Sequence, residues 1–102
     1  MTSIGARRVL IVEHEPLAAA TVATELESLG YHVCGVSTTP DDALAAVVCA
    51  QPHVALMDVC LAAGSDGIDT ARRICLRRDT AIVFLTARSD EATLARALEV
   101  SP

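Results

Sequence analysis

The chain has 102 residues, of which 52% are hydrophobic, with a formal charge of −5 and a pI of about 4.9. This size suits one domain with its own core, so we expect residues 1–102 to form a single domain without an output domain. The acidic charge disfavours nucleic acid as a direct partner. No apolar run approaches the ~18 residues of a membrane span, and no signal peptide is recognisable, so we expect a cytoplasmic location without membrane contact.

Short apolar runs alternate along the chain with segments of helical periodicity. In chain order, the pattern predicts a strand over 7–12, a helix over 16–30, a strand over 31–36, a helix over 39–51, a strand over 53–58, a helix over 67–77, a strand over 81–85 and a helix over 89–98. Alternating elements of this length indicate an α/β fold, with a parallel sheet and right-handed crossovers.

Several local signals support these boundaries. Apolar residues recur at helical spacing in the first helix (Leu17, Val22, Leu26, Leu29), which Pro16 opens and Gly30 stops. The second helix starts at the capping sequence Thr39-Pro40-Asp41-Asp42. On the third helix, four residues are expected on the inner face: Ile68, Ala71, Ile74 and Cys75.

The cysteines form no CxxC pair, which argues against a disulfide framework or a zinc site. We interpret Cys34, Cys49 and Cys75 as small core residues, and Cys60 as the one that can be exposed. The arginines at 72, 73, 77 and 78 are expected on the solvent side of their helix.

Three apolar runs each end at one polar residue, namely Glu13, Asp58 and Thr86. Ligands of parallel sheets lie just beyond the carboxyl ends of the strands, so these side chains are expected to converge. Two carboxylates and a hydroxyl make a site for a hard cation and a phosphoryl group. Asp58 is interpreted as a nucleophile that forms an aspartyl phosphate, against the alternative that it caps a turn.

Glu13 is interpreted as an oxygen ligand for Mg²⁺, although it could instead cap the first helix. Thr86 is expected to donate a hydrogen bond to the phosphoryl oxygen. The small Ala87 would let that group approach.

Four motifs in order resemble the receiver domain of two-component response regulators: VLIVEHEP at 9–16, ALMD at 55–58, SDGID at 65–69 and FLTAR at 84–88. The resemblance implies a flavodoxin-like parallel sheet of order 2-1-3-4-5 with helices on both faces. It also implies that Asp58 accepts a phosphoryl group from a sensor histidine kinase or phosphotransfer protein, to switch binding of a downstream protein. Mg²⁺ would be held by Glu13, Asp58 and the backbone carbonyl of Cys60.

Two departures from the family pattern modify this expectation. The family usually has two adjacent acids after the first strand, whereas here the pair is Glu13-His14. Imidazole is a poor Mg²⁺ ligand, so we expect weak Mg²⁺ affinity and only a doubtful metal role for His14.

The sequence also ends before the family's fifth strand, with its lysine, and fifth helix, leaving about four strands and four helices. An exposed fourth strand would favour a homodimer through that edge, or through exchanged elements.

A receiver that works without phosphorylation, as an interaction or dimerisation module, is the main alternative. His14 and the missing fifth-strand lysine favour it, and Asp58 and Thr86 oppose it. Enzyme activity is not expected: a haloacid-dehalogenase-type phosphatase needs an Asp at position 60, and the turn at 13–16 lacks the glycines of a nucleotide-binding loop.

Overall fold

The computed structural model describes residues 7–58 and 66–85. Its strands are β1 (Arg8–Val12), β2 (His32–Ser37), β3 (Val54–Asp58) and β4 (Ala81–Leu85), all parallel, in the order β2-β1-β3-β4. The helices are α1 (Pro16–Ser28), α2 (Pro40–Ala50) and α3 (Gly67–Arg77). The expected α/β class and the order of these four strands are confirmed. The helix expected over 89–98 lies outside the described residues.

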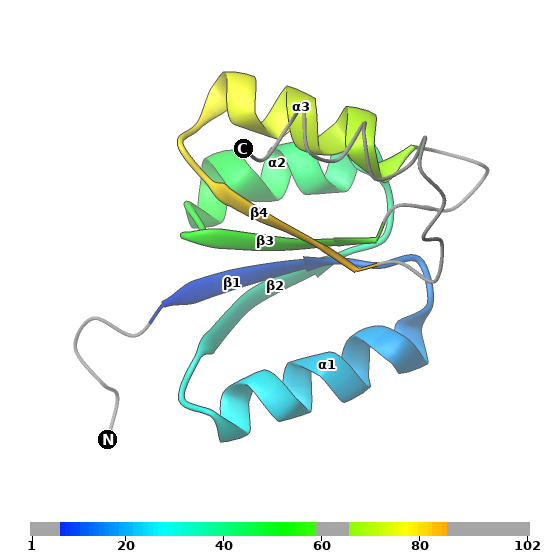
Figure 1. The fold of residues 1–102 in the computed structure, drawn as a ribbon, viewed down its shortest axis with the longest axis vertical. Coiled ribbons are helices and arrows are strands. Elements are labelled where there is room, and N and C mark those ends of the chain that lie inside the picture. Colours follow the sequence, from blue (N-terminus) through cyan, green and yellow to red (C-terminus); the bar gives the residue numbers. More distant parts are fainter. Residues whose placement is uncertain (1–6, 59–65, 86–102) are drawn as a thin grey trace.

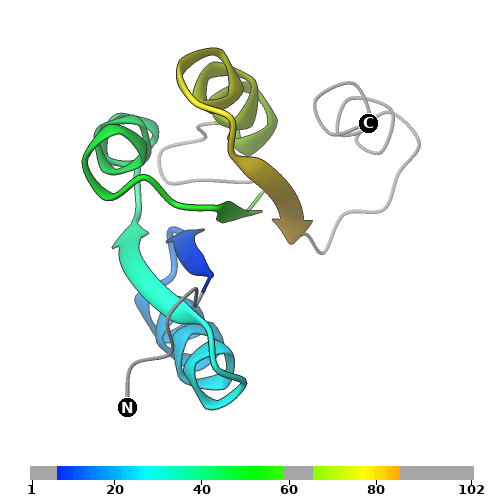
Figure 2. The ribbon, with the colours of Figure 1, turned by 90° about the vertical axis from the view of Figure 1, so that its left-hand side faces the viewer.

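The sheet forms the middle layer, with α1 on one face and α2 and α3 on the other (Figures 1 and 2). The main core lies between the sheet and the α2–α3 layer. Its buried members come from strands and helices alike: Leu10, Val12, Ala43, Leu44, Val47, Ala55, Met57, Ala71, Ile74 and Ile82. With one phenylalanine and no tryptophan in the chain, aliphatic residues fill this interior.

Side-chain caps start two of the helices. Thr39 Oγ1 accepts a hydrogen bond from the Asp42 N–H at 3.2 Å, which confirms the predicted start of α2. Asp66 Oδ1 accepts from the Ile68 and Asp69 N–H groups at the start of α3.

The apolar periodicity of α1 predicted a helix correctly, and two of its four residues, Val22 and Leu26, are half-buried. Leu17 and Leu29 are 83% and 73% exposed, and Ala19 is the fully buried residue of this helix. The helix ends at Ser28, and Gly30 adopts a φ of 97°, a conformation that favours glycine. The most buried residue of α1 is therefore a small one.

The cysteine interpretation was wrong for Cys49 and Cys75, which are exposed, while Cys34 is half-buried. Successive helical residues are about 100° apart, so Ile74 turns to the core and Cys75 away from it. Cys34 is the extra residue of a bulge in β2: Val9 pairs with Val33, but Leu10 pairs with Gly35.

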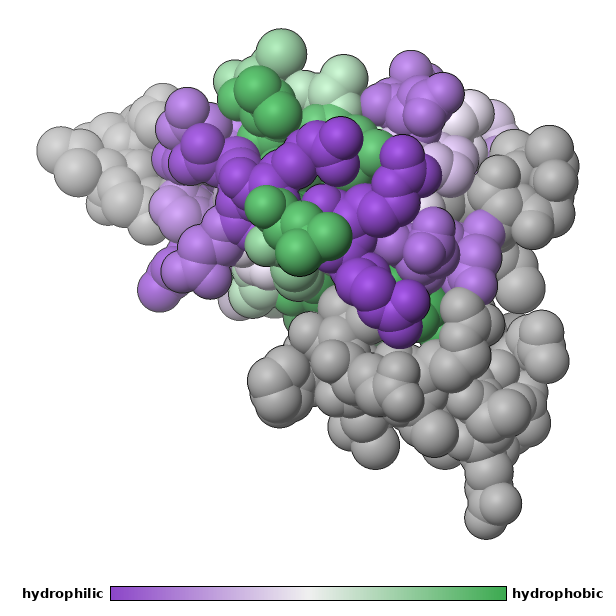
Figure 3. All heavy atoms as spheres, turned by 90° about the horizontal axis from the view of Figure 1, so that it is seen from above, coloured by the Kyte–Doolittle hydropathy of each residue, from purple (hydrophilic) through white to green (hydrophobic). Residues whose placement is uncertain are grey.

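The outer face of α3 is the solvent face that the arginines predicted. Arg72, Arg73, Arg77 and Arg78 are exposed. In Figure 3, the described part of the face seen from above is largely hydrophilic, with a few apolar groups among the polar ones. In the described part of the chain, no helix is long and apolar enough to cross a membrane.

Gln51 ends α2 in a left-handed conformation, with φ 49° and ψ 59°. We expect Gln51→Gly to raise the free energy of unfolding by about 0.5–1 kcal/mol, because glycine adopts this conformation without the steric cost of a Cβ. The Gln51 carbonyl, which accepts from the Arg8 guanidinium at 2.7 Å, is retained. Urea denaturation of Gln51→Gly beside Gln51→Ala would test this, and equal stability of the two variants would contradict it.

Candidate functional site

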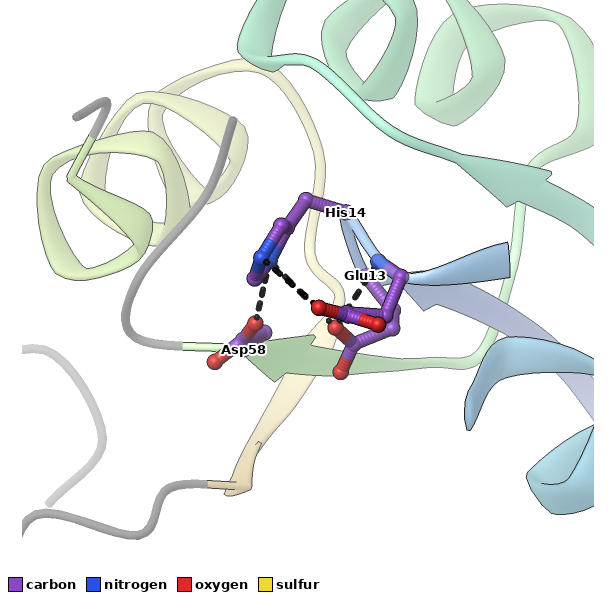
Figure 4. Close-up of polar contacts among 4 residues, drawn as sticks. Glu13, His14 and Asp58 are labelled. Atoms are coloured by element: carbon purple, nitrogen blue, oxygen red, sulfur yellow. Dashed lines mark hydrogen bonds and ion pairs between the residues drawn. The ribbon is translucent and has the colours of Figure 1, made fainter. Parts of the chain in front are cut away.

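The proposed site lies where β1 and β3 end. These strands are neighbours, with Val12 opposite Met57, so the residues that follow Val12 come close to Asp58. Glu13, His14 and Asp58 are grouped there, and Figure 4 shows the three side chains facing one another. One ligand atom from each residue lies within 4.8 Å of the others. The predicted convergence of Glu13 and Asp58 is therefore present.

Two backbone contacts fix Glu13. Its N–H donates to the Ser37 carbonyl at 2.9 Å, and its Oε1 accepts from the Glu15 N–H at 3.1 Å. Its side chain is 16% exposed, and burial raises the pKa of this carboxyl, with the Asp58 carboxylate adding to the effect. Glu15 is the residue before α1, and its side chain does not cap the helix. The backbone at the start of α1 is instead bound by the Glu13 carboxylate, which belongs to the site.

His14 lies between the two carboxylates. Its Nδ1 is 3.2 Å from Asp58 Oδ2 and 3.4 Å from Glu13 Oε1, and its Nε2 is 3.7 Å from Glu15 Oε1. The hydrogen bond to Asp58 is the main cause of a raised pKa for His14. The imidazole thus has three acidic neighbours, and its protonated form offsets part of their charge.

The stability that His14 contributes depends on pH in a defined direction. Its pKa is higher in the folded chain than the value of about 6.5 expected in the unfolded chain. This contribution is therefore fully present below pH about 6.5 and is lost as the pH rises through the folded pKa.

His53 provides an internal comparison, because its Nδ1 accepts a hydrogen bond from the Arg8 N–H at 2.9 Å. Desolvation and the neighbouring Arg8 lower the pKa of His53. We expect an NMR titration of the imidazole resonances to show His14 titrating above pH about 6.5 and His53 below it. Asp58→Asn should lower the pKa of His14 and leave that of His53 unchanged. A His14 pKa unaffected by Asp58→Asn would contradict the contact.

The donor set fits Mg²⁺ only in part. Glu13 and Asp58 supply the carboxylate oxygens that Mg²⁺ accepts, while His14 supplies a nitrogen that suits transition metals better. The direction of the His14 side chain could not be predicted from the sequence, because a loop residue follows neither strand nor helix periodicity.

Three further predicted site residues, Cys60, Thr86 and Ala87, lie outside the described residues. The last described residue, Leu85, pairs with Asp58 across β3 and β4. The predicted roles of these three residues remain predictions.

The model of the response regulator receiver domain family matches residues 9–101. The chain belongs to this family. The receiver is 35% identical over 83 residues to the phyllosphere-induced regulator PhyR of Methylorubrum extorquens, covering 80% of this chain and 31% of PhyR. It is 36% identical over 91 residues to the transcriptional regulatory protein PdtaR of Mycobacterium tuberculosis, covering 89% of this chain and 44% of PdtaR.

Among solved structures, the receiver domain of a modulated diguanylate cyclase from Desulfovibrio desulfuricans matches with a TM-score of 0.86 and 40% identity, covering 95% of this chain and 77% of that one. The receiver spans less than half the length of the two curated relatives. These relatives are regulatory proteins, and the flavodoxin-like fold expected for the chain is confirmed.

Proposed function

We propose that this receiver is a phosphoacceptor that takes a phosphoryl group onto Asp58 from a histidine kinase or a phosphotransfer protein. The observation that carries the proposal is the placement of Asp58. It ends β3, an inner strand of the described sheet, is 15% exposed, and lies beside Glu13 and His14. A carboxylate at this edge of a parallel sheet is open to a ligand beyond the strand ends.

The chemistry needs only the Asp58 carboxylate as nucleophile. One of its oxygens attacks the phosphorus of the donor, the bond between phosphorus and the donor's leaving atom breaks, and the leaving group departs with that electron pair. The product is an acyl phosphate on Asp58. Negative charge gathers at this point in the transition state, and a protonated His14 at 3.2 Å would offset part of it.

A divalent cation would supply further neutralisation, as is usual in phosphoryl transfer. For Mg²⁺, the described ligands would be the carboxylates of Glu13 and Asp58. We expect its affinity to be weak, because the neighbouring position holds His14 instead of an acid.

Incubation of the receiver with acetyl phosphate and a divalent cation tests the proposal directly. Intact-mass measurement should show the gain of one phosphoryl group, removed by hydroxylamine, which cleaves acyl phosphates. Circular dichroism of the same sample shows whether the protein is folded. A folded receiver that gains no mass would contradict the proposal.

That result would favour the second candidate, a phosphorylation-independent interaction module. The position of His14 favours this candidate specifically, because a histidine that binds both carboxylates can hold the site in one arrangement without phosphate. His14→Ala would separate the two candidates: the module predicts altered partner binding, and the phosphoacceptor predicts altered phosphorylation.

We also propose that the receiver works in the cytoplasm, that phosphorylation switches its binding to a downstream protein, and that two copies pair along β4. β4 lies at an edge of the described sheet, with Val83 47% and Leu85 37% exposed. Apolar edge strands favour pairing with a second chain. Light scattering at tens of micromolar would show a dimer that Val83→Lys dissociates, while a monomeric mass for the native chain would contradict the pairing.

A further inference from the structure

We propose that Glu13, His14 and Asp58 form a site that prefers a first-row transition ion such as Zn²⁺ or Co²⁺ to Mg²⁺, with His14 Nδ1 as a direct ligand. The inference concerns the same site as the proposed function and names the class of cation that this site prefers. It does not require phosphoryl transfer.

The spacing of the donor atoms supports a tetrahedral ion. His14 Nδ1 is 3.2 Å from Asp58 Oδ2 and 3.4 Å from Glu13 Oε1. In a tetrahedral zinc site with bonds of about 2.0–2.1 Å, the ligand atoms are about 3.3–3.4 Å apart. The nitrogen therefore lies, from one oxygen of each carboxylate, at the ligand-to-ligand separation of a tetrahedral site. All three donor atoms lie within 4.8 Å of one another, so side-chain movements would complete a three-ligand set.

The donor types select the ion. Mg²⁺ requires oxygen ligands in near-octahedral geometry and retains its water, whereas Zn²⁺ and Co²⁺ bind imidazole nitrogen and carboxylate oxygen together. Three protein ligands leave a fourth position for water or a phosphoryl oxygen, which is the arrangement of an open zinc site rather than a closed structural one.

The surroundings of His14 are those of a metal-binding histidine. Its other nitrogen, Nε2, faces Glu15 Oε1 at 3.7 Å. In the metal-free chain Nδ1 donates its proton to Asp58 Oδ2, and an ion would displace that proton. The carboxylate near Nε2 would orient the ligating imidazole and keep the remaining proton on that nitrogen. Glu13 is in turn held by the Glu15 N–H, which makes the three ligands a connected set.

Calorimetric titration of the native receiver with Zn²⁺, Co²⁺ and Mg²⁺ tests the preference, with Co²⁺ absorption as a second readout of geometry. We expect Zn²⁺ and Co²⁺ to bind more tightly than Mg²⁺. His14→Asp should lower Co²⁺ and Zn²⁺ affinity by about tenfold or more and raise Mg²⁺ affinity. His32→Gln, which changes an exposed histidine outside the cluster, should have no effect.

Two further variants test whether a cysteine, rather than this site, binds the ion. Cys60→Ser should keep Co²⁺ binding, and Asp58→Asn should weaken it. Tighter Mg²⁺ binding than Zn²⁺ binding in the native chain would overturn the inference, as would Zn²⁺ affinity that is unchanged in His14→Asp. Because metal binding is measured without a phosphoryl donor, these results are distinct from a failure of acetyl phosphate labelling, which bears on the proposed function alone.

Discussion

Asp58→Asn is expected to abolish phosphoryl uptake from acetyl phosphate while leaving the receiver folded. An amide is not a nucleophile that forms an acyl phosphate, so no labelled species should remain. The side chains are similar in size, and the amide oxygen can still accept a hydrogen bond from His14, which is 3.2 Å from Asp58 Oδ2 in the native chain. We therefore expect the free energy of unfolding to change by no more than about 1 kcal/mol.

Intact mass after acetyl phosphate treatment measures phosphoryl uptake, and urea denaturation measures the free energy of unfolding. Glu13→Gln is the matched control, because it removes a neighbouring carboxylate of the cluster but keeps the acceptor; this variant should be labelled, although more slowly. A phosphoryl gain that persists in Asp58→Asn would place the acceptor elsewhere and refute its assignment.

Ile74→Ala is expected to lower the free energy of unfolding by about 2–5 kcal/mol. Ile74 is fully buried in the cluster between the sheet and the α2–α3 layer, so its truncation removes apolar contacts and leaves a cavity. A domain of this size is stabilised by only about 5–15 kcal/mol, so the loss would be a large part of the total.

Leu76→Ala makes a similar truncation two residues along α3, at a side chain that is 82% exposed. It should change stability by no more than about 0.5 kcal/mol. Urea titrations followed by circular dichroism compare the two variants. Equal destabilisation by both would show that α3 does not pack as described.

The sequence predicted those elements whose boundaries depend on local chemistry. The strand over 81–85 and the helix over 67–77 have the predicted bounds, because each is delimited by a change in hydrophobic pattern. The Thr39 cap was equally predictable from the sequence, because its hydroxyl accepts a hydrogen bond from the Asp42 N–H of the first helical turn. This local contact does not depend on what packs against the helix.

Burial was less predictable, because it depends on what packs against each helix. Leu17 and Cys75 both lie in apolar helical segments, yet both are exposed. Periodicity indicates that a segment is helical and which residues share a face. Which of those residues are buried is decided by the elements that pack against the helix. On α1, Ala19 is buried and Leu26 half-buried, whereas Leu17 and Leu29 are exposed.

The candidate site was predictable to the extent that strand ends define it. Glu13 and Asp58 follow neighbouring strands, so topology alone brings their backbones together. The contacts of His14 were not predictable, because they depend on the conformation of the turn between β1 and α1 and on side-chain rotation within it.

The bulge at Cys34 reaches the site through the strand register. The extra residue advances the second half of β2 by one position relative to β1, so that Ser37 lies opposite Val12 and its carbonyl meets the Glu13 N–H. Asp58, in contrast, is carried by β3, which pairs with β1 without a break. One carboxylate is thus tied to an outer strand and the other to an inner one. A one-residue insertion or deletion in β2, well away from the turn, would therefore change the distance between the Glu13 and Asp58 carboxylates. The site would be altered although none of its own residues had changed.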